Sequence, residues 1–234
     1  MPPSFSVIIP CFNEARDIAA TLKIIKDFFA KKAWPAEIIV VDDGSGDDTA
    51  NLARASGAKV ITNGVNRGKG YSVKVGITAA GGDYILFTDA DLSTPITELE
   101  KLLKFLPEYD IAIGSRAAIG AKVTKNQIWP KVLFGKLGNK LIKLVLGLEI
   151  NDTQCGFKLF KALAAKKIIE KQTLNRWGFD FELLLIAKIQ SYKIKEVGVL
   201  WSNDPSSQVG FLDYVKTLGE VLKVKMNFWQ KKYQ

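Results

Sequence analysis

Two aspartates that are one residue apart, Asp89 and Asp91, follow the apolar run YILFT at 84–88. Two carboxylates this close repel each other, and a divalent cation bound between them would offset the repulsion. The same ion could bridge to the phosphates of a substrate. The alternative is a polar turn at the end of a strand, because Asp, Ser, Thr and Pro also favour such turns. The pair alone leaves both interpretations open.

Polar residues follow two other apolar runs. The stretch EIIVVDDGS at 37–45 contains Asp42, and a carboxylate at the carboxyl end of a strand suits a base or a ribose contact. Asp47 or Asp48 precedes a helical stretch, and we expect one of them to cap that helix. In NRGKG at 66–70, glycines and a lysine precede another helix, which is typical of an anion site. The spacing matches neither the Walker nor the dinucleotide motif.

Strands and helices alternate around these residues. Strands are predicted at 5–10, 37–45, 58–63, 83–91 and 109–116, and helices at about 14–32, 47–56 and 69–80. This alternation predicts an α/β fold with a doubly wound, mostly parallel sheet. Ligands bind at the carboxyl ends of the strands in such sheets. The polar residues expected at those ends are Asp42, Asp43, Asp89, Asp91 and Arg116.

The second half of the chain is strongly basic. Residues 1–116 contain 13 Lys and Arg against 15 Asp and Glu, whereas residues 117–234 contain 20 against 9. This excess favours an anionic partner such as a phosphorylated substrate, lipid headgroups or nucleic acid. Nucleic acid is disfavoured because the basic half has no recognised nucleic-acid motif. We expect one domain over 1–234, with amphipathic helices at about 128–148 and 209–230 in its second half.

Composition restricts the chemistry and the compartment. The chain has no histidine, so acid–base or metal chemistry must depend on carboxylates, lysines and arginines. Two cysteines do not make the disulfide framework of a secreted protein, and a reducing cytoplasm suits them. No uncharged apolar stretch reaches about 18 residues, and the start of the chain lacks a basic region before its first apolar run. We therefore expect neither a transmembrane helix nor a signal peptide.

Several motifs in chain order carry a resemblance to a known family. SVIIPCFNEARDI, VVDDGSGDDT, NRGKG, FTDAD and GSR together resemble family 2 glycosyltransferases, which have a GT-A fold. DTQCGFKLF at 152–160 and RWGFDFELLLIA at 176–187 resemble the dolichyl-phosphate β-glucosyltransferase branch. The resemblance implies metal-dependent, inverting transfer of glucose from UDP-glucose to a polyprenyl or dolichyl phosphate. The alternatives are transfer of mannose from GDP-mannose and transfer to a glycan hydroxyl.

The resemblance also implies roles for individual residues. The nucleotide-sugar residues are Pro10, Glu14, Asp42, Arg67, Lys69 and Asp89. Asp89 and Asp91 would bind Mg²⁺ or Mn²⁺, and Ser93 stands where the mannosyl branch has glutamine as a third ligand. Arg116 and Lys131 match the region that binds the acceptor phosphate. The catalytic candidates that orient the sugar or act as a base are Asp152, Gln154, Asp180 and Arg116, with Asp180 preferred to Glu182.

Two features bear on the acceptor. The family loop after the last strand tends to end in Gly-Ser-Lys, whereas this chain has Ser207 and Gln208 without the lysine. A polyprenyl acceptor lies in a bilayer, and a helix at 128–148 in the headgroups would reach it. The aromatic residues that could lie at the interface are Trp129, Phe228, Trp229 and Tyr233. The alternative is that the leucine stripe of this helix packs in the protein core and that its lysines face the solvent. We expect peripheral association with the inner, cytoplasmic face of a membrane.

Overall fold

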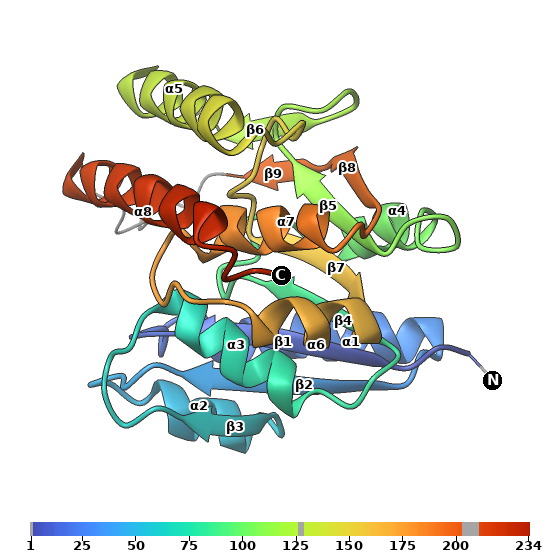
Figure 1. Ribbon diagram of the computed structural model, residues 1–234. Coiled ribbons are helices and arrows are strands. Elements are labelled where there is room, and N and C mark those ends of the chain that lie inside the picture. Colours follow the sequence, from blue (N-terminus) through green and yellow to red (C-terminus); the bar gives the residue numbers. More distant parts are fainter. Residues whose placement is uncertain (1, 126–128, 203–210) are drawn as a thin grey trace.

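The computed structural model describes residues 2–125, 129–202 and 211–234, without the side chains of 125, 129–134, 136 and 211–215. Within these residues a sheet has the strand order β3-β2-β1-β4-β7-β5-β8 (Figure 1). Its strands are β1 Phe5–Cys11, β2 Ala36–Asp42, β3 Lys59–Thr62, β4 Tyr84–Thr88, β5 Ile111–Ser115, β7 Phe157–Lys161 and β8 Ile194–Gly198. The pairs β1–β2, β2–β3, β1–β4 and β5–β8 are parallel, as predicted.

Strand β7 departs from the predicted order. It lies between β4 and β5 and runs antiparallel to both, so that Phe157 pairs with Thr88. Its first residues therefore lie at the edge where β4 ends. The sequence pattern does not predict β7, because Lys158 interrupts its apolar run and lysine is rarely buried. After β8 the chain continues into β9 Leu200–Ser202, which pairs with β6 Lys122–Lys125 in a small separate sheet.

Helices cover both faces of the large sheet. The bounds are α1 Ile18–Lys32, α2 Thr49–Ala55, α3 Lys69–Ala79, η1 Ile96–Glu98, α4 Leu99–Leu103, α5 Trp129–Leu146, α6 Ala162–Glu170, α7 Phe179–Ile189 and α8 Phe211–Trp229. Ile77, Ile168 and Phe181 from α3, α6 and α7 are buried with one face of the strands. Leu22 and Leu102 from α1 and α4 are buried with the other face. The doubly wound, mostly parallel α/β fold is thus confirmed.

Helices α5 and α8 lie side by side at the upper left of Figure 1, beyond the edge of the sheet. Ile142 and Leu146 of α5 join the core, as do Val221 and Val224 of α8. The basic character predicted for both helices stays a prediction, because part of their side chains lies outside the description. Over residues 2–125, 129–202 and 211–234, no helix has the length and apolar character needed to cross a membrane.

One aromatic residue of the C-terminal segment is not where we expected it. Tyr233 is 1% exposed, and its hydroxyl donates a hydrogen bond of 2.7 Å to Glu182 Oε1. The expectation of a Tyr233 side chain at a membrane interface is therefore wrong, because this ring closes the core beneath α7 and α8. Phe228 and Trp229 remain 39% and 69% exposed.

Candidate active site

Acidic residues gather where the parallel strands end. Cys11 at the end of β1 pairs with Asp42 at the end of β2, and β4 ends at Thr88, directly before Asp89. Burial raises the pKa of the Cys11 thiol well above its usual value. The charges of Glu14, Asp42 and Asp89 raise that pKa further.

The loop before α3 is held by a residue to which the sequence did not assign a role. Asp43 is buried and accepts hydrogen bonds from the backbone N–H groups of Arg67 (3.0 Å) and Gly68 (2.7 Å). Gly68 has φ +104°, and a Cβ there would lie 2.4 Å from the carbonyl oxygen of Asn175. Only glycine suits this position. Lys69, the first residue of α3, is thereby fixed at the edge of the sheet.

An ammonium group lies among three carboxylates at this edge. Lys69 Nζ is 2.5 Å from Asp89 Oδ1. Burial alone would lower the pKa of Lys69, but the charges of Asp89, Asp180 and Asp91 outweigh it and raise that pKa. Ser93 donates its backbone N–H (2.8 Å) and its hydroxyl (2.9 Å) to Asp91. Burial and the charge of Asp89 still raise the pKa of Asp91.

A second ion pair is buried beside the first. Lys158 of β7 has no exposed surface and pairs with Asp180 in the first turn of α7, and it also donates to the carbonyl of Cys155 at 2.7 Å. Burial raises the pKa of Asp180, although the charges of Lys158 and Lys69 oppose this. Sequence reasoning found Asp180 but missed Lys158. A lysine inside a buried strand requires an anionic partner, but the sequence pattern does not predict the strand that buries Lys158.

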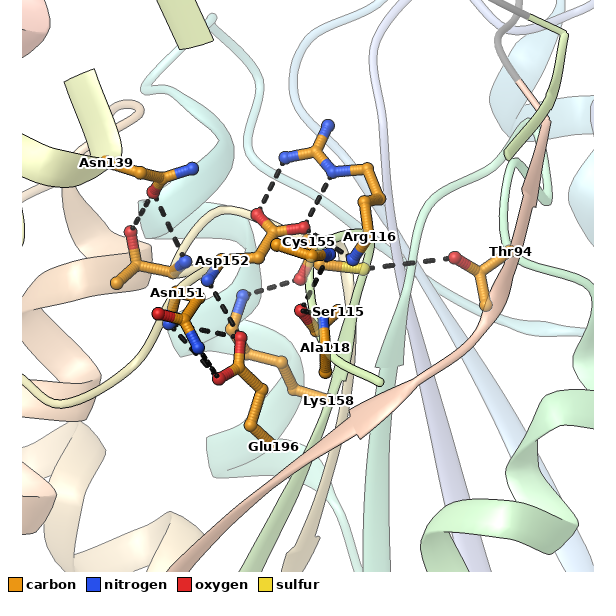
Figure 2. A network of polar contacts seen from close by, with 12 residues as sticks. Thr94, Ser115, Arg116, Ala118, Asn139, Asn151, Asp152, Cys155, Lys158 and Glu196 are labelled. Atoms are coloured by element: carbon orange, nitrogen blue, oxygen red, sulfur yellow. Dashed lines mark hydrogen bonds and ion pairs between the residues drawn. The ribbon is translucent and has the colours of Figure 1, made fainter. Parts of the chain in front are cut away.

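Arg116 and Asp152 form a third pair, which Figure 2 shows from close by. The guanidinium Nε and one Nη each lie 2.7 Å from an oxygen of Asp152, and the Arg116 backbone N–H adds a bond of 2.9 Å. Burial would raise the pKa of Asp152, but the Arg116 charge outweighs it and lowers that pKa. Glu196 accepts the Asp152 backbone N–H at 2.9 Å. Asp152 is thus a fixed anion that orients Arg116.

The other predicted site residues lie around this centre. Pro10 is the second-last residue of β1, and Arg67 is exposed and donates to the hydroxyl of Tyr71 at 3.1 Å. Gln154 is half-buried in the loop that precedes β7. The backbone of Lys131 belongs to α5, but its side chain lies outside the described part of the chain. The loop with Ser207 and Gln208 also lies outside the described residues.

Two further residues support the site. A Cβ on Gly156 would lie 2.0 Å from Asp89 Oδ2, so a glycine is needed where β7 passes the aspartate. Glu182 is fully buried and accepts the backbone N–H groups of Thr173 (3.1 Å) and Leu174 (2.8 Å). Glu182 therefore anchors the segment before α7, which explains why it does not share the role of its neighbour two residues earlier.

The aspartate pair fits a hard divalent cation. Asp89 and Asp91 offer carboxylate oxygens, which Mg²⁺ and Mn²⁺ prefer. Asp89 Oδ1 is buried and accepts no hydrogen bond within the described residues, although it contacts the Lys69 ammonium. In the part of the chain that the structure describes, no group of three His, Cys, Asp or Glu side chains could hold a metal. A metal on this pair would therefore take its remaining ligands from water or from a substrate phosphate.

The fold and the site together define a class of enzyme. A doubly wound sheet with two aspartates after a central strand, faced by lysine and arginine, is typical of a GT-A glycosyltransferase. Residues 6–169 match the model of glycosyl transferase family 2, and the chain belongs to this family.

Relatives within the family are similar over most of the chain. The dolichyl-phosphate β-glucosyltransferase of Homo sapiens is 32% identical, over 95% of this chain and 75% of that protein. The enzyme of the same name from Drosophila melanogaster is 34% identical, over 87% of this chain and 68% of that protein. The one from Saccharomyces cerevisiae is 29% identical, over 95% and 74%.

Solved structures agree on the fold. Mannosyl-3-phosphoglycerate synthase from Rubrobacter xylanophilus has a TM-score of 0.69 at 17% identity, over 98% of this chain and 75% of that chain. Glucosyl-3-phosphoglycerate synthase from Mycobacterium tuberculosis, in complex with Mn²⁺, UDP and phosphoglyceric acid, has a TM-score of 0.68 at 19% identity, over 95% and 77%. At these identities the likeness shows the fold alone.

Proposed function

We propose that this chain transfers glucose from UDP-glucose to a polyprenyl phosphate of the dolichyl type, with inversion at the anomeric carbon. The observation that carries the proposal is the similarity, over 95% of the chain, to a protein named dolichyl-phosphate β-glucosyltransferase. The charges at the site support it. Lys69 and Arg116 suit a reaction between two anionic substrates, and the chain has no histidine to act as a base.

The proposed reaction needs cations more than it needs a base. An oxygen of the acceptor phosphate attacks the anomeric carbon and forms the new C–O bond. The bond from that carbon to the diphosphate breaks, and its electron pair leaves on UDP. A phosphate monoester is already anionic at neutral pH, so no proton has to be removed from it. We assign Lys69 to the donor diphosphate, and Arg116 and Lys131 to the acceptor phosphate, because cations must hold the two anions together.

Asp89 and Asp91 would hold Mg²⁺ or Mn²⁺, which when bound neutralises charge on the diphosphate leaving group. A protein of the same fold crystallised with Mn²⁺ and UDP agrees with this assignment. Pro10, Glu14, Asp42 and Arg67 are assigned to the nucleotide and its sugar. The buried ion pair with Lys158 favours Asp180 as a fixed anion that orients the sugar, and Gln154, in the loop before β7, remains a second candidate for that role.

We further propose that α5 and α8 rest on the cytoplasmic face of a membrane, where a polyprenyl phosphate is accessible. Large apolar side chains on both helices are exposed: Leu137, Leu141, Leu144, Leu218, Leu222, Met226 and Trp229. Lys140 and Lys223 are exposed on the same two helices. Exposed apolar area beside lysines suits the headgroup region of an anionic bilayer.

The activity is tested with purified protein, a polyprenyl phosphate and labelled UDP-glucose or GDP-mannose, with Mg²⁺, Mn²⁺ or EDTA. We expect chloroform-extractable sugar from UDP-glucose with metal, and none with EDTA or in Asp91→Asn. Asp17→Asn, in an exposed ion pair with Arg16, is the matched control that should keep full activity. Product from GDP-mannose alone would move the proposal to a mannosyltransferase, and product from neither donor would refute it.

The acceptor class and the membrane contact have separate tests. Asp180→Asn should weaken transfer to a phosphate, whereas it should abolish transfer to a hydroxyl acceptor that needs a base. For the membrane, the double variant Leu144→Asp/Leu222→Asp should lose flotation with anionic liposomes. Leu163→Asp is the matched control, because Leu163 is 71% exposed but lies on α6. Equal flotation of the double variant and the wild type would contradict the membrane surface.

A further inference from the structure

The aspartate pair already has a cation. Lys69 Nζ lies 2.5 Å from Asp89 Oδ1, a buried oxygen that has no other polar partner within the described residues. Asp91 differs, because both of its oxygens accept hydrogen bonds from Ser93. The ammonium of Lys69 therefore occupies the position on Asp89 that a divalent ion would need.

Asp89 has little room to give way. On the side of β7, the position of a Cβ on Gly156 lies 2.0 Å from Asp89 Oδ2 and 2.8 Å from Oδ1, so the carboxylate lies almost against the backbone there. On the other side is the Lys69 ammonium. A metal that binds Asp89 must therefore displace the ammonium, since the carboxylate is confined by the strand.

The Lys69 side chain, in contrast, has several rotatable bonds beyond a backbone that is held in place. The backbone before Lys69 is held through Gly68 by the 2.7 Å hydrogen bond to Asp43. Its Nζ lies 5.4 Å from the centre of the Phe87 ring and 5.5 Å from that of the Trp177 ring, so the path of the side chain is bounded by aromatic faces that tolerate a cation.

A displaced ammonium needs another anion. Asp180 is close enough to act on Lys69 electrostatically, but it is paired with the fully buried Lys158. Asp91 also acts on Lys69, but it would be occupied by the metal. The remaining anion is the one that the proposed function supplies, a nucleoside diphosphate. We propose that Lys69 holds Asp89 before substrates bind and moves to the donor diphosphate when a metal binds Asp89. Metal and nucleoside diphosphate then bind cooperatively. The metal replaces Lys69 as the partner of Asp89, and the diphosphate replaces Asp89 as the partner of Lys69.

This inference rests on the proposed function, and the test separates the two. Mn²⁺ binding to the whole protein is measured by electron paramagnetic resonance and titration calorimetry, with and without UDP. In the wild type, UDP should raise Mn²⁺ affinity at least about 10-fold, within the range of ordinary coupling between two sites. In Lys69→Met, Mn²⁺ alone should bind about 10-fold more tightly than in the wild type. The gain from UDP should be smaller than in the wild type, because only direct ligation of the metal by the diphosphate remains.

Two further variants make the result specific. Lys69→Arg keeps a cation and should keep both the weak Mn²⁺ binding and the gain from UDP. Lys74→Met removes a lysine from the same helix whose ammonium bonds the carbonyl of Gln172, and it should behave as the wild type. Thermal unfolding confirms that each variant is folded. If Lys69→Met bound Mn²⁺ no more tightly than the wild type, or kept the full gain from UDP, the exchange would be refuted. A wild type that binds neither Mn²⁺ nor UDP would instead refute the proposed function.

Discussion

Adding one methyl group beside Asp89 should disable the site without unfolding the protein. In Gly156→Ala the new Cβ would lie 2.0 Å from Asp89 Oδ2, whereas ordinary contact begins at 3.4 Å, so the carboxylate must move by about 1.4 Å. It cannot move toward Lys69, which is already 2.5 Å away. A displacement of about 1 Å in a catalytic geometry can cost about 100-fold in rate, or roughly 2.7 kcal/mol of transition-state stabilisation.

The assay is kcat/KM for transfer from UDP-glucose, together with the melting temperature. We expect a loss of about 100-fold in kcat/KM. The melting curve should stay cooperative, with a melting temperature lowered by a few degrees at most, because Gly156 is half-buried and the clash is with one side chain. Gly81→Ala is the matched control, since the nearest atom to its new Cβ is Glu37 Oε1 at an ordinary 3.5 Å and Gly81 lies before β4, at its other end. A variant of Gly156 with wild-type kcat/KM would show that Asp89 is not held as described.

Three further predictions concern buried charges and a thiol. Asp152→Asn should lower the free energy of unfolding in urea by about 2–3 kcal/mol. This is less than for a fully buried pair, because the arginine partner is partly exposed. The control, Asp17→Asn, should lower it by less than about 1 kcal/mol. The pKa of Asp152 is lowered in the folded state, so this stability is present at neutral pH and should decrease as the pH falls below about 4; a difference between wild type and variant that does not shrink as the pH falls below about 4 would contradict it. Lys158→Met should cost about 3–5 kcal/mol by leaving a buried carboxylate unpaired, and adding Asp180→Asn should recover part of that loss; no recovery would count against the ion pair. Burial raises the pKa of Cys155 to about 12, so iodoacetamide at pH 8 should modify this thiol only after unfolding; modification of the folded protein at the rate of a free thiol would exclude its burial.

The parallel part of the fold could be predicted because its signals are local. The apolar runs that became β1, β2 and β4 each precede a helix, and the observed bounds differ from the expected ones by a few residues at most. The position of β7 could not be predicted in this way. Its place between β4 and β5 depends on pairing with strands far away in the sequence, and alternation of strands and helices contains no such information.

The residues of the candidate site also differ in whether local sequence patterns could predict them. Asp42, Asp89 and Asp91 could be recognised because each ends a strand with a recognisable pattern. Asp43 could be placed at the same edge, but its role in holding the loop before α3 could not be predicted. Neither could the role of Gly156, because both roles depend on backbone from another part of the chain. The hydrogen bond from Gly68 to Asp43 and the contact between Gly156 and Asp89 exist only after folding.

The antiparallel strand also has a consequence for synthesis on the ribosome. β5 is the strand that leads into Arg116, and its two neighbours in the sheet, β7 and β8, both come later in the chain. A nascent chain that ends soon after Arg116 can pair β1, β2, β3 and β4, but its β5 has no partner strand. The edge of β4 therefore stays open until β7 has left the exit tunnel at Lys161, and one edge of β5 stays open until β8 has left it at Gly198. A ribosome stalled before these residues would present an unpaired strand edge.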